Sequence, residues 1–225
     1  MFTPPDSIEV AVAQSIASCL SAIDRGITRL LVDLRFPELR QLPVAHGFAQ
    51  ALSQRYGDRW QGIFADAGSA ALAQRDWTDI TIPLRGVNEG RRAIGDDKEV
   101  FLVVAPTSVE LDQVEKLLQL AHDRPFILLN PRLENMEVGI GLAARRMRER
   151  FLYTFETVYY LQPLEQGFIW RSYPQLWQVW LEDECIQELP AKPSGEDLNR
   201  LIAQKTGKNN SFFDRLQRLL NALNR

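Results

Sequence analysis

Length, composition and charge place this chain among ordinary soluble proteins. It has 225 residues, of which 45% are apolar and 24% are charged, and its formal net charge is −3. A charge this close to neutral gives no overall attraction to nucleic acid, and no apolar run approaches the ~20 residues that span a bilayer. The N-terminus lacks a secretory signal pattern, and the distant Cys19 and Cys185 give no disulfide framework. We therefore expect a cytoplasmic protein that does not bind nucleic acid.

The first part of the chain alternates helical and strand patterns. The first helix should bury one apolar face, made of Ile8, Val12, Ile16, Cys19, Leu20 and Ile23. The segments that follow are predicted, in chain order, as a strand at 29–34, a helix at 43–56, a strand at 61–66, a short helix at 69–75 and an edge strand at 79–84. After a loop at 87–99, we expect a strand at 100–106, a helix capped by Ser108 that carries Val109, a strand at 125–131 and a helix at 140–155. Wholly apolar strands separated by helices predict a parallel sheet covered on both faces.

The second part has a different pattern. Three aromatic, β-prone runs at 157–164, 167–174 and 176–183 are joined by very short links, which allow antiparallel pairing and exclude helical crossovers. The predicted fold is α/β, with a Rossmann-like, largely parallel sheet extended by a C-terminal antiparallel β-meander. A single domain should cover residues 1–187, and 188–225 should hold a linker at 188–197 and amphipathic helices.

The aromatic residues of the meander cannot all face one core, because neighbouring strand residues point to opposite faces. The six rings concerned are Tyr159, Tyr160, Trp170, Tyr173, Trp177 and Trp180. We expect two aromatic faces, one of them covered by helices that include the C-terminal segment. The other face is either domain core or a surface for a partner.

Polar residues follow several strands of the predicted parallel sheet. In open α/β sheets, ligands bind at the carboxyl ends of the strands. The candidates for ligand binding are Asp66, Ser69, Thr107, Asn130 and Arg132. We expect Asp66 at the end of an inner strand, on the same edge as Asn130, with a helix starting at Gly68 or Ser69. A structural alternative stays open, because Asp66 can instead accept the amides of that helix and Asn130 can end its strand in a turn.

No enzyme motif is complete. Residues 139–144 satisfy a loose dinucleotide pattern, but no strand directly precedes them as that fingerprint requires. His46 and His122 lack a neighbouring nucleophile motif, and the chain has no metal-ligand spacing. We therefore expect no catalytic residues, no metal and no cofactor, and the interpretation leans away from an enzyme.

The C-terminus reads as a basic amphipathic helix. The candidate residues for a partner or membrane surface are Phe212, Phe213, Arg215, Leu216, Arg218 and Leu219. Such a helix suits peripheral contact with a membrane or a partner groove, and packing on its own domain would explain the apolar face equally well.

Four sequence blocks carry a family resemblance: "DAGSAALAQRDW", "VAPTSVELDQVEKL", "LLNPRLE" and "VYYLQPLEQGFIWRSYPQLWQVW". Over roughly residues 4–200 the chain resembles a cyanobacterial and plastid domain of unknown function. That family includes the plant protein Low PSII Accumulation 3 and a domain fused to a chloroplast adenylate kinase. The resemblance implies an oxygenic phototroph and a role in photosystem II assembly, with photosystem II subunits or other thylakoid proteins as partners. It transfers no catalytic residue.

Two functional hypotheses follow. The first is a non-catalytic accessory protein that assists photosystem II assembly at the cytosolic face of the thylakoid. The second is a small-molecule or nucleotide-binding domain that uses the crevice at the carboxyl ends of the strands.

Overall fold

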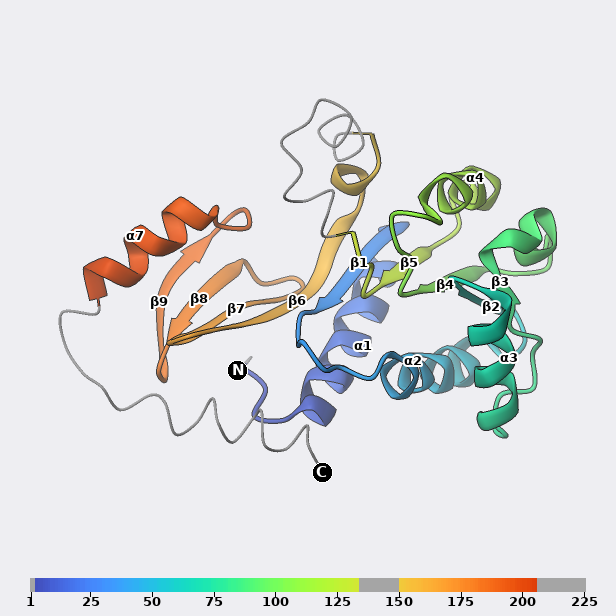
Figure 1. Cartoon of the computed structure of the whole chain (residues 1–225), viewed down its shortest axis with the longest axis horizontal. Coiled ribbons are helices and arrows are strands. Elements are labelled where there is room, and N and C mark those ends of the chain that lie inside the picture. The colour runs from blue at the N-terminus through green and yellow to red at the C-terminus, as the bar shows by residue number, and fades with distance from the viewer. Residues whose placement is uncertain (1–2, 134–149, 206–225) are drawn as a thin grey trace.

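Helices and strands alternate along most of the chain, and four consecutive strands follow (Figure 1). The computed structural model describes residues 3–133 and 150–205. Its elements are α1 (Ile8–Asp24), β1 (Arg29–Leu34), α2 (Gln41–Tyr56), β2 (Trp60–Phe64), α3 (Ala67–Asp76), β3 (Arg85–Gly86), the 3-10 helix η1 (Val87–Ala93), β4 (Val100–Val104), α4 (Leu111–Ala121), β5 (Phe126–Leu129), the 3-10 helix η2 (Leu152–Thr154), β6 (Glu156–Leu164), β7 (Gly167–Ser172), β8 (Trp177–Leu181), β9 (Glu184–Leu189) and α7 (Gly195–Lys205).

All nine strands form one sheet, in the order β3-β2-β4-β5-β1-β6-β7-β8-β9. Every pairing from β3 to β6 is parallel, and every pairing from β6 to β9 is antiparallel. The predicted fold class is therefore confirmed: an α/β protein whose mostly parallel sheet is extended by a C-terminal meander. The predicted helix at 140–155 lies mainly outside the described residues, and its described end forms η2.

Both faces of the parallel strands are covered, as their wholly apolar sequences predict. In β4, Val100, Leu102 and Val104 belong to the core that α1, α2 and α3 close. The alternate residues Phe101 and Val103 belong to the second core, under η1 and α4. Figure 1 shows α1, α2 and α3 below the sheet and α4 above it.

The helix α1 differs from its prediction in the face that it buries. Its fully buried residues are small: Ala11, Ser15, Ser18, Cys19 and Ala22. The larger Ile8, Val12, Ile16, Leu20 and Ile23 are only partly buried at the margin of the core. The hydroxyls of Ser18 and Ser172 are 2.9 Å apart at the contact between α1 and β7. The spacing of apolar residues predicted the position of the helix correctly. The side that contacts the sheet carries small residues, because the helix approaches the sheet closely there.

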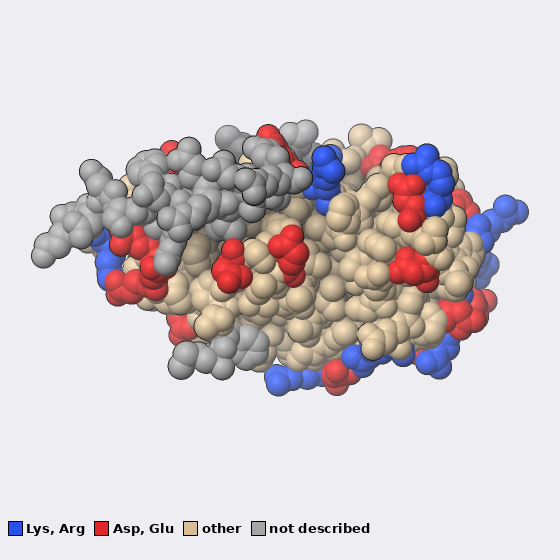
Figure 2. Space-filling model, turned by 90° about the horizontal axis from the view of Figure 1, so that it is seen from below, with Lys and Arg blue, Asp and Glu red and all other residues tan. Residues whose placement is uncertain are grey.

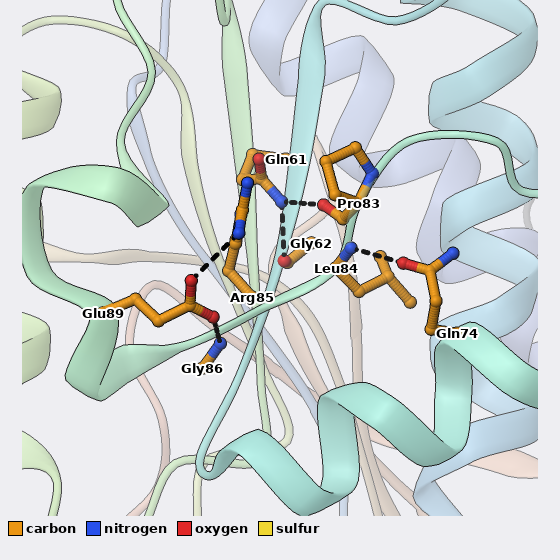
Figure 3. Close-up of polar contacts among 8 residues, drawn as sticks. All are labelled: Gln61, Gly62, Gln74, Pro83, Leu84, Arg85, Gly86 and Glu89. Carbon is orange, nitrogen blue, oxygen red and sulfur yellow. Dashed lines mark hydrogen bonds and ion pairs between the residues drawn. The ribbon is translucent and has the colours of Figure 1, made fainter.

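Residues 79–84 were predicted as an edge strand, and they form no strand. Pro83 has no N–H to donate to a ladder. Instead the buried Gln61 side chain donates its Nε2–H to the carbonyl oxygens of Pro83 (2.7 Å) and Gly62 (3.0 Å). The Leu84 amide donates to Gln74 Oε1 at 2.8 Å, as Figure 3 shows. Two glutamine side chains thus replace ladder bonds at this edge, and β3 is left with two residues.

The meander has one strand more than predicted. β9 crosses the predicted domain boundary at residue 187, and α7 begins inside the predicted linker.

The two aromatic faces are confirmed. Tyr159 and Trp170 lie in the core between the sheet and α1. Tyr160 and Trp177 lie on the opposite face of the sheet, where Leu198 of α7 packs against them. The covering helix is therefore α7, and residues 211–223 lie outside the described part of the chain.

Candidate functional site

The candidate ligand-binding residues lie along one edge of the sheet. Asp66 follows β2, Thr107 follows β4, and Asn130 follows β5. Because these strands are parallel neighbours, their carboxyl ends share an edge. The predicted position of Asp66 at the end of an inner strand is therefore confirmed, although α3 starts at Ala67 and not at the predicted Gly68 or Ser69.

Asp66 is the N-cap of α3. Its Oδ1 accepts the Ser69 amide at 2.8 Å, and its Oδ2 accepts the Ser69 hydroxyl at 2.6 Å. These hydrogen bonds from Ser69 hold the pKa of the exposed carboxyl below its ordinary value. Asp66 and Ser69 thus satisfy each other, which is the structural alternative that the sequence left open.

Replacing Asp66 by alanine should lower the free energy of unfolding by about 1 kcal/mol at pH 7, which is the usual contribution of an N-cap. A carboxyl whose pKa is depressed by folding contributes stability above the unfolded pKa, about 3.9, and that contribution is lost as the pH falls below it. The difference between wild type and Asp66→Ala should therefore shrink between pH 5 and pH 2. Urea denaturation measures it, with Asp66→Asn as a capping control that does not titrate. A stability difference between wild type and Asp66→Ala that stays constant over this pH range would contradict the role of the ionised Asp66 carboxylate as the N-cap.

Thr107 opens α4. Its amide and its hydroxyl both donate to Glu110 Oε2, at 2.9 Å and 2.6 Å. The helix consequently begins at Leu111 rather than after Ser108 as predicted, and Val109 stands outside it with 84% of its surface exposed. Glu110, which sequence reasoning missed, has the Thr-x-x-Glu spacing of a capping box as its signal.

Arg132 is the candidate with the most available side chain. Its amide donates to the Pro106 carbonyl at 2.8 Å, and its backbone forms an isolated parallel bridge with Thr107. The structure thus brings Thr107 and Arg132 together. The Arg132 side chain is exposed, and no described residue forms a hydrogen bond or ion pair with its guanidinium.

Asn130 is buried and joins three elements. Its Oδ1 accepts the Leu34 amide at the end of β1 (2.8 Å), and its Nδ2–H donates to Gln41 Oε1 at the start of α2 (2.8 Å). Its backbone lies in the left-handed region, with φ of 46°, a conformation that asparagine tolerates better than most residues. Asn130 therefore ends β5 and connects it to β1 and α2, so its side-chain amide has a structural role.

Two residues at the end of β1 were absent from the predicted site. Asp33 is buried, and its Oδ2 lies 2.7 Å from Nε of Arg35. The Arg35 guanidinium lies 5.6 Å from the centre of the Tyr160 ring. The signal in the sequence was an aspartate inside an otherwise apolar strand.

The described part of the chain has few features of a ligand-binding site. Within residues 3–133 and 150–205, no three His, Cys, Asp or Glu side chains are grouped to hold a metal ion. A shallow hollow of about 250 Å³ lies at the opposite end of the strands, lined by residues 27–29 and 153–156. The hydrogen bonds of Asp66, Thr107 and Asn130 are those of helix starts and strand ends.

A second region stands out on the helices below the sheet. Residues 10–23 of α1, 41–54 of α2 and 67–74 of α3 contain no Asp, Glu, Lys or Arg. We call the solvent-facing side of these three segments the charge-poor face. It exposes Ala13 and Ala17, 39% of Val10 and 38% of Leu72. Figure 2 shows uncharged atoms over most of the middle of the molecule seen from this side.

The charge-poor face is one continuous surface. Gly47 lets α2 approach α1, because a Cβ at this position would lie 3.3 Å from Cγ1 of Val12. Between α2 and α3, the His46 ring stacks on Trp77 with their centres 5.0 Å apart. One carboxylate lies at the junction of α2 and α3, where Asp79 is 2.7 Å from Nε2 of His46 and accepts the Gln50 amide at 2.7 Å. Elsewhere charged residues return at the helix ends, where Asp24 of α1 pairs with Arg55 of α2.

The other helices have the usual charged outer surfaces. α4 carries Asp112, Glu115 and Lys116, and α7 carries Glu196, Asp197, Arg200 and Lys205. A solvated helix normally has such residues on its polar side. Their absence from three adjacent segments in the same molecule therefore marks the charge-poor face as a candidate interface.

The fold and these two regions define a mixed-sheet α/β protein with a scaffold-like carboxyl edge and an uncharged helical face. The family model described as "Domain of unknown function (DUF1995)" matches residues 5–200, and the chain belongs to this family. The match covers the entire sheet and ends within α7. Among the helices that the structure describes, none is both long and apolar enough to cross a membrane.

Proposed function

We propose that this protein is a non-catalytic accessory protein that acts by binding another protein through its charge-poor face. The observation that carries the proposal is the lack of charged residues in 10–23 of α1, 41–54 of α2 and 67–74 of α3, beside helices of ordinary polarity. Interfaces are depleted in charged residues at their core, where charge must be desolvated.

The apolar exposed side chains of this face suit a flat, uncharged partner surface. Val10, Ala13, Ala17 and Leu72 are small or aliphatic and add apolar area at little conformational cost. Burying such area contributes about 25 cal/mol per Å², with no ion to desolvate. A low-charge helix is the partner surface that fits best.

The family resemblance supplies the setting of the proposal. In an oxygenic phototroph, the partners would be photosystem II subunits or other thylakoid proteins, met at the cytosolic face of the membrane. The protein would then assist photosystem II assembly and contact the membrane at most peripherally. Residues 212–219, the predicted partner or membrane surface, lie outside the described residues.

One observation favours a second candidate, a small-molecule or nucleotide site at the carboxyl edge. The backbone of Arg132 bridges to Thr107, and its exposed side chain could hold an anionic group at this edge. A thermal shift with nucleotides or phosphorylated metabolites that disappears in Arg132→Gln would support this alternative.

A matched pair of variants tests the main proposal. Ala17→Lys places a charge on the charge-poor face, and Gln119→Lys places the same charge on the exposed side of α4. Tagged proteins would be added to solubilised cyanobacterial membranes, and the recovered photosystem II subunits would be measured. We expect Ala17→Lys to lower recovery about tenfold, which corresponds to about 1.4 kcal/mol, and Gln119→Lys to leave it unchanged. Equal recovery by both variants, with unchanged melting temperatures, would overturn the use of this face.

A further inference from the structure

The two edges of the nine-stranded sheet are built differently. At the β3 edge, the strand has two residues, and the side chains of Gln61 and Gln74 take up the neighbouring backbone groups. At the other edge, β9 has six residues, and its one ladder partner among the described strands is β8. An edge strand of this length presents backbone N–H and C=O groups that another chain can pair with.

The β9 edge is also uniformly acidic. Between Arg171 and Lys192 the charged residues are Glu182, Asp183, Glu184 and Glu188, and all four are exposed. Pairing of β9 with β9 of a second copy would bring these carboxylates together, and like charges on paired strands destabilise a sheet. The same charges favour a strand that carries lysine or arginine.

A contact within the chain shows that a cation reaches this edge. Nζ of Lys205, at the end of α7, lies 2.8 Å from Oε1 of Glu184. The packing of α7 occurs elsewhere, because Leu198 contacts the face of the sheet around Tyr160 and Trp177. That contact covers a face of the meander, and within residues 3–133 and 150–205 only β8 pairs with the ladder groups of β9.

We propose that β9 accepts an extended, lysine- or arginine-bearing segment of a partner protein as an added strand. Main-chain hydrogen bonds would provide the pairing, and Glu184 and Glu188 would select the charge of the segment. This surface is separate from the charge-poor face, so the proposal does not depend on the proposed function.

Peptide binding tests the charge selection. The probes are a short peptide that alternates lysine with valine and a matched peptide with glutamate in place of lysine. We expect the full-length protein to bind the first and not the second. The double variant Glu184→Lys/Glu188→Lys should weaken binding of the lysine peptide at least tenfold. The double variant Asp96→Lys/Asp123→Lys has the same net charge and alters exposed sites outside the meander, so it should bind like the wild type. Equal weakening by both double variants would overturn the proposal.

Amide hydrogen exchange tests the strand pairing. We expect the outward-facing β9 amides to exchange rapidly in the free protein and to become protected when the lysine peptide is added. Protection that is already present in the free monomer would overturn the proposal, because the chain would then cover its own edge. Protection that rises with protein concentration alone would also overturn it, in favour of a second copy.

Discussion

Replacing Gly167 by alanine should cost about 3 kcal/mol or more of unfolding free energy, because severe overpacking against fixed backbone exceeds the usual range for core substitutions. Gly167 begins β7 and pairs with Leu164 on one side and Leu181 on the other. A Cβ at this position would lie 1.8 Å from the carbonyl oxygen of Trp180 and 2.9 Å from its carbonyl carbon. No side-chain rotation relieves a clash with backbone, so β8 would have to separate from β7.

Gly195→Ala is the matched control for Gly167→Ala. Gly195 is the first residue of α7, and a Cβ there would meet no atom within 4 Å. We expect this variant to have unchanged stability or slightly increased stability, as for glycine replacement in an unstrained position. Chemical denaturation monitored by tryptophan fluorescence compares the two. If both variants unfold at the same denaturant concentration, the close packing of β7 against β8 is wrong.

Replacing Asn130 by alanine should cost about 2–5 kcal/mol, from two separate causes. Loss of the amide leaves the buried Leu34 N–H without its acceptor, at about 1–3 kcal/mol. Alanine must also adopt the left-handed backbone of Asn130, which costs an L-residue roughly 1–2 kcal/mol. The contacts to Leu34 and Gln41 join β1 and α2 to β5, so the effect should be global rather than confined to one loop.

The variant Asn130→Gly separates these two causes. Glycine also removes the amide, but it adopts a positive φ without steric cost. We therefore expect Asn130→Gly to be destabilised by about 1 kcal/mol less than Asn130→Ala. Urea denaturation with a common slope gives both values. Equal losses would assign the whole effect to the hydrogen bonds, and losses well below 1 kcal/mol in both would contradict a scaffold role for Asn130.

The fold was largely predictable because its strands have strong one-dimensional signals. "RLLVDL", "VFLVV" and "FILL" are apolar without alternation, which is typical of parallel strands covered on both faces. Short links between aromatic runs similarly required antiparallel pairing. Strand order was not predictable, because β1 pairs with β5 and β6 through contacts that no local pattern encodes.

The wrong secondary-structure predictions fall where side-chain contacts, rather than the spacing of apolar residues, determine the backbone conformation. Residues 79–84 have a strand-like composition, but hydrogen bonds from Gln61 and Gln74 hold them in another form. β9 was missed because "ECIQEL" is polar, as an edge strand is free to be.

The positions of Asp66 and Asn130 in the fold were predictable, but their hydrogen-bond partners were not. Asp66 and Asn130 do lie on one sheet edge, but their partners, Ser69 for Asp66, and Leu34 and Gln41 for Asn130, are invisible to motif reading. The charge-poor face, in contrast, is visible in the sequence as three segments without charge. It was overlooked because an apolar helix is ordinarily read as core.

The central place of β1 has a consequence for how the chain acquires its shape during synthesis. β1 leaves the ribosome before β5 and β6, yet Arg29 pairs with Phe126 on one side and Leu30 with Glu156 on the other. Until β5 has been translated, this apolar strand has no native ladder partner, and β2 cannot substitute because the two are not neighbours. The nascent chain must therefore carry an unpaired, aggregation-prone strand while residues 35–125 are translated. The meander is the opposite case, since each of its strands finds its partner as soon as the next turn emerges, and contacts that are local in sequence form fastest.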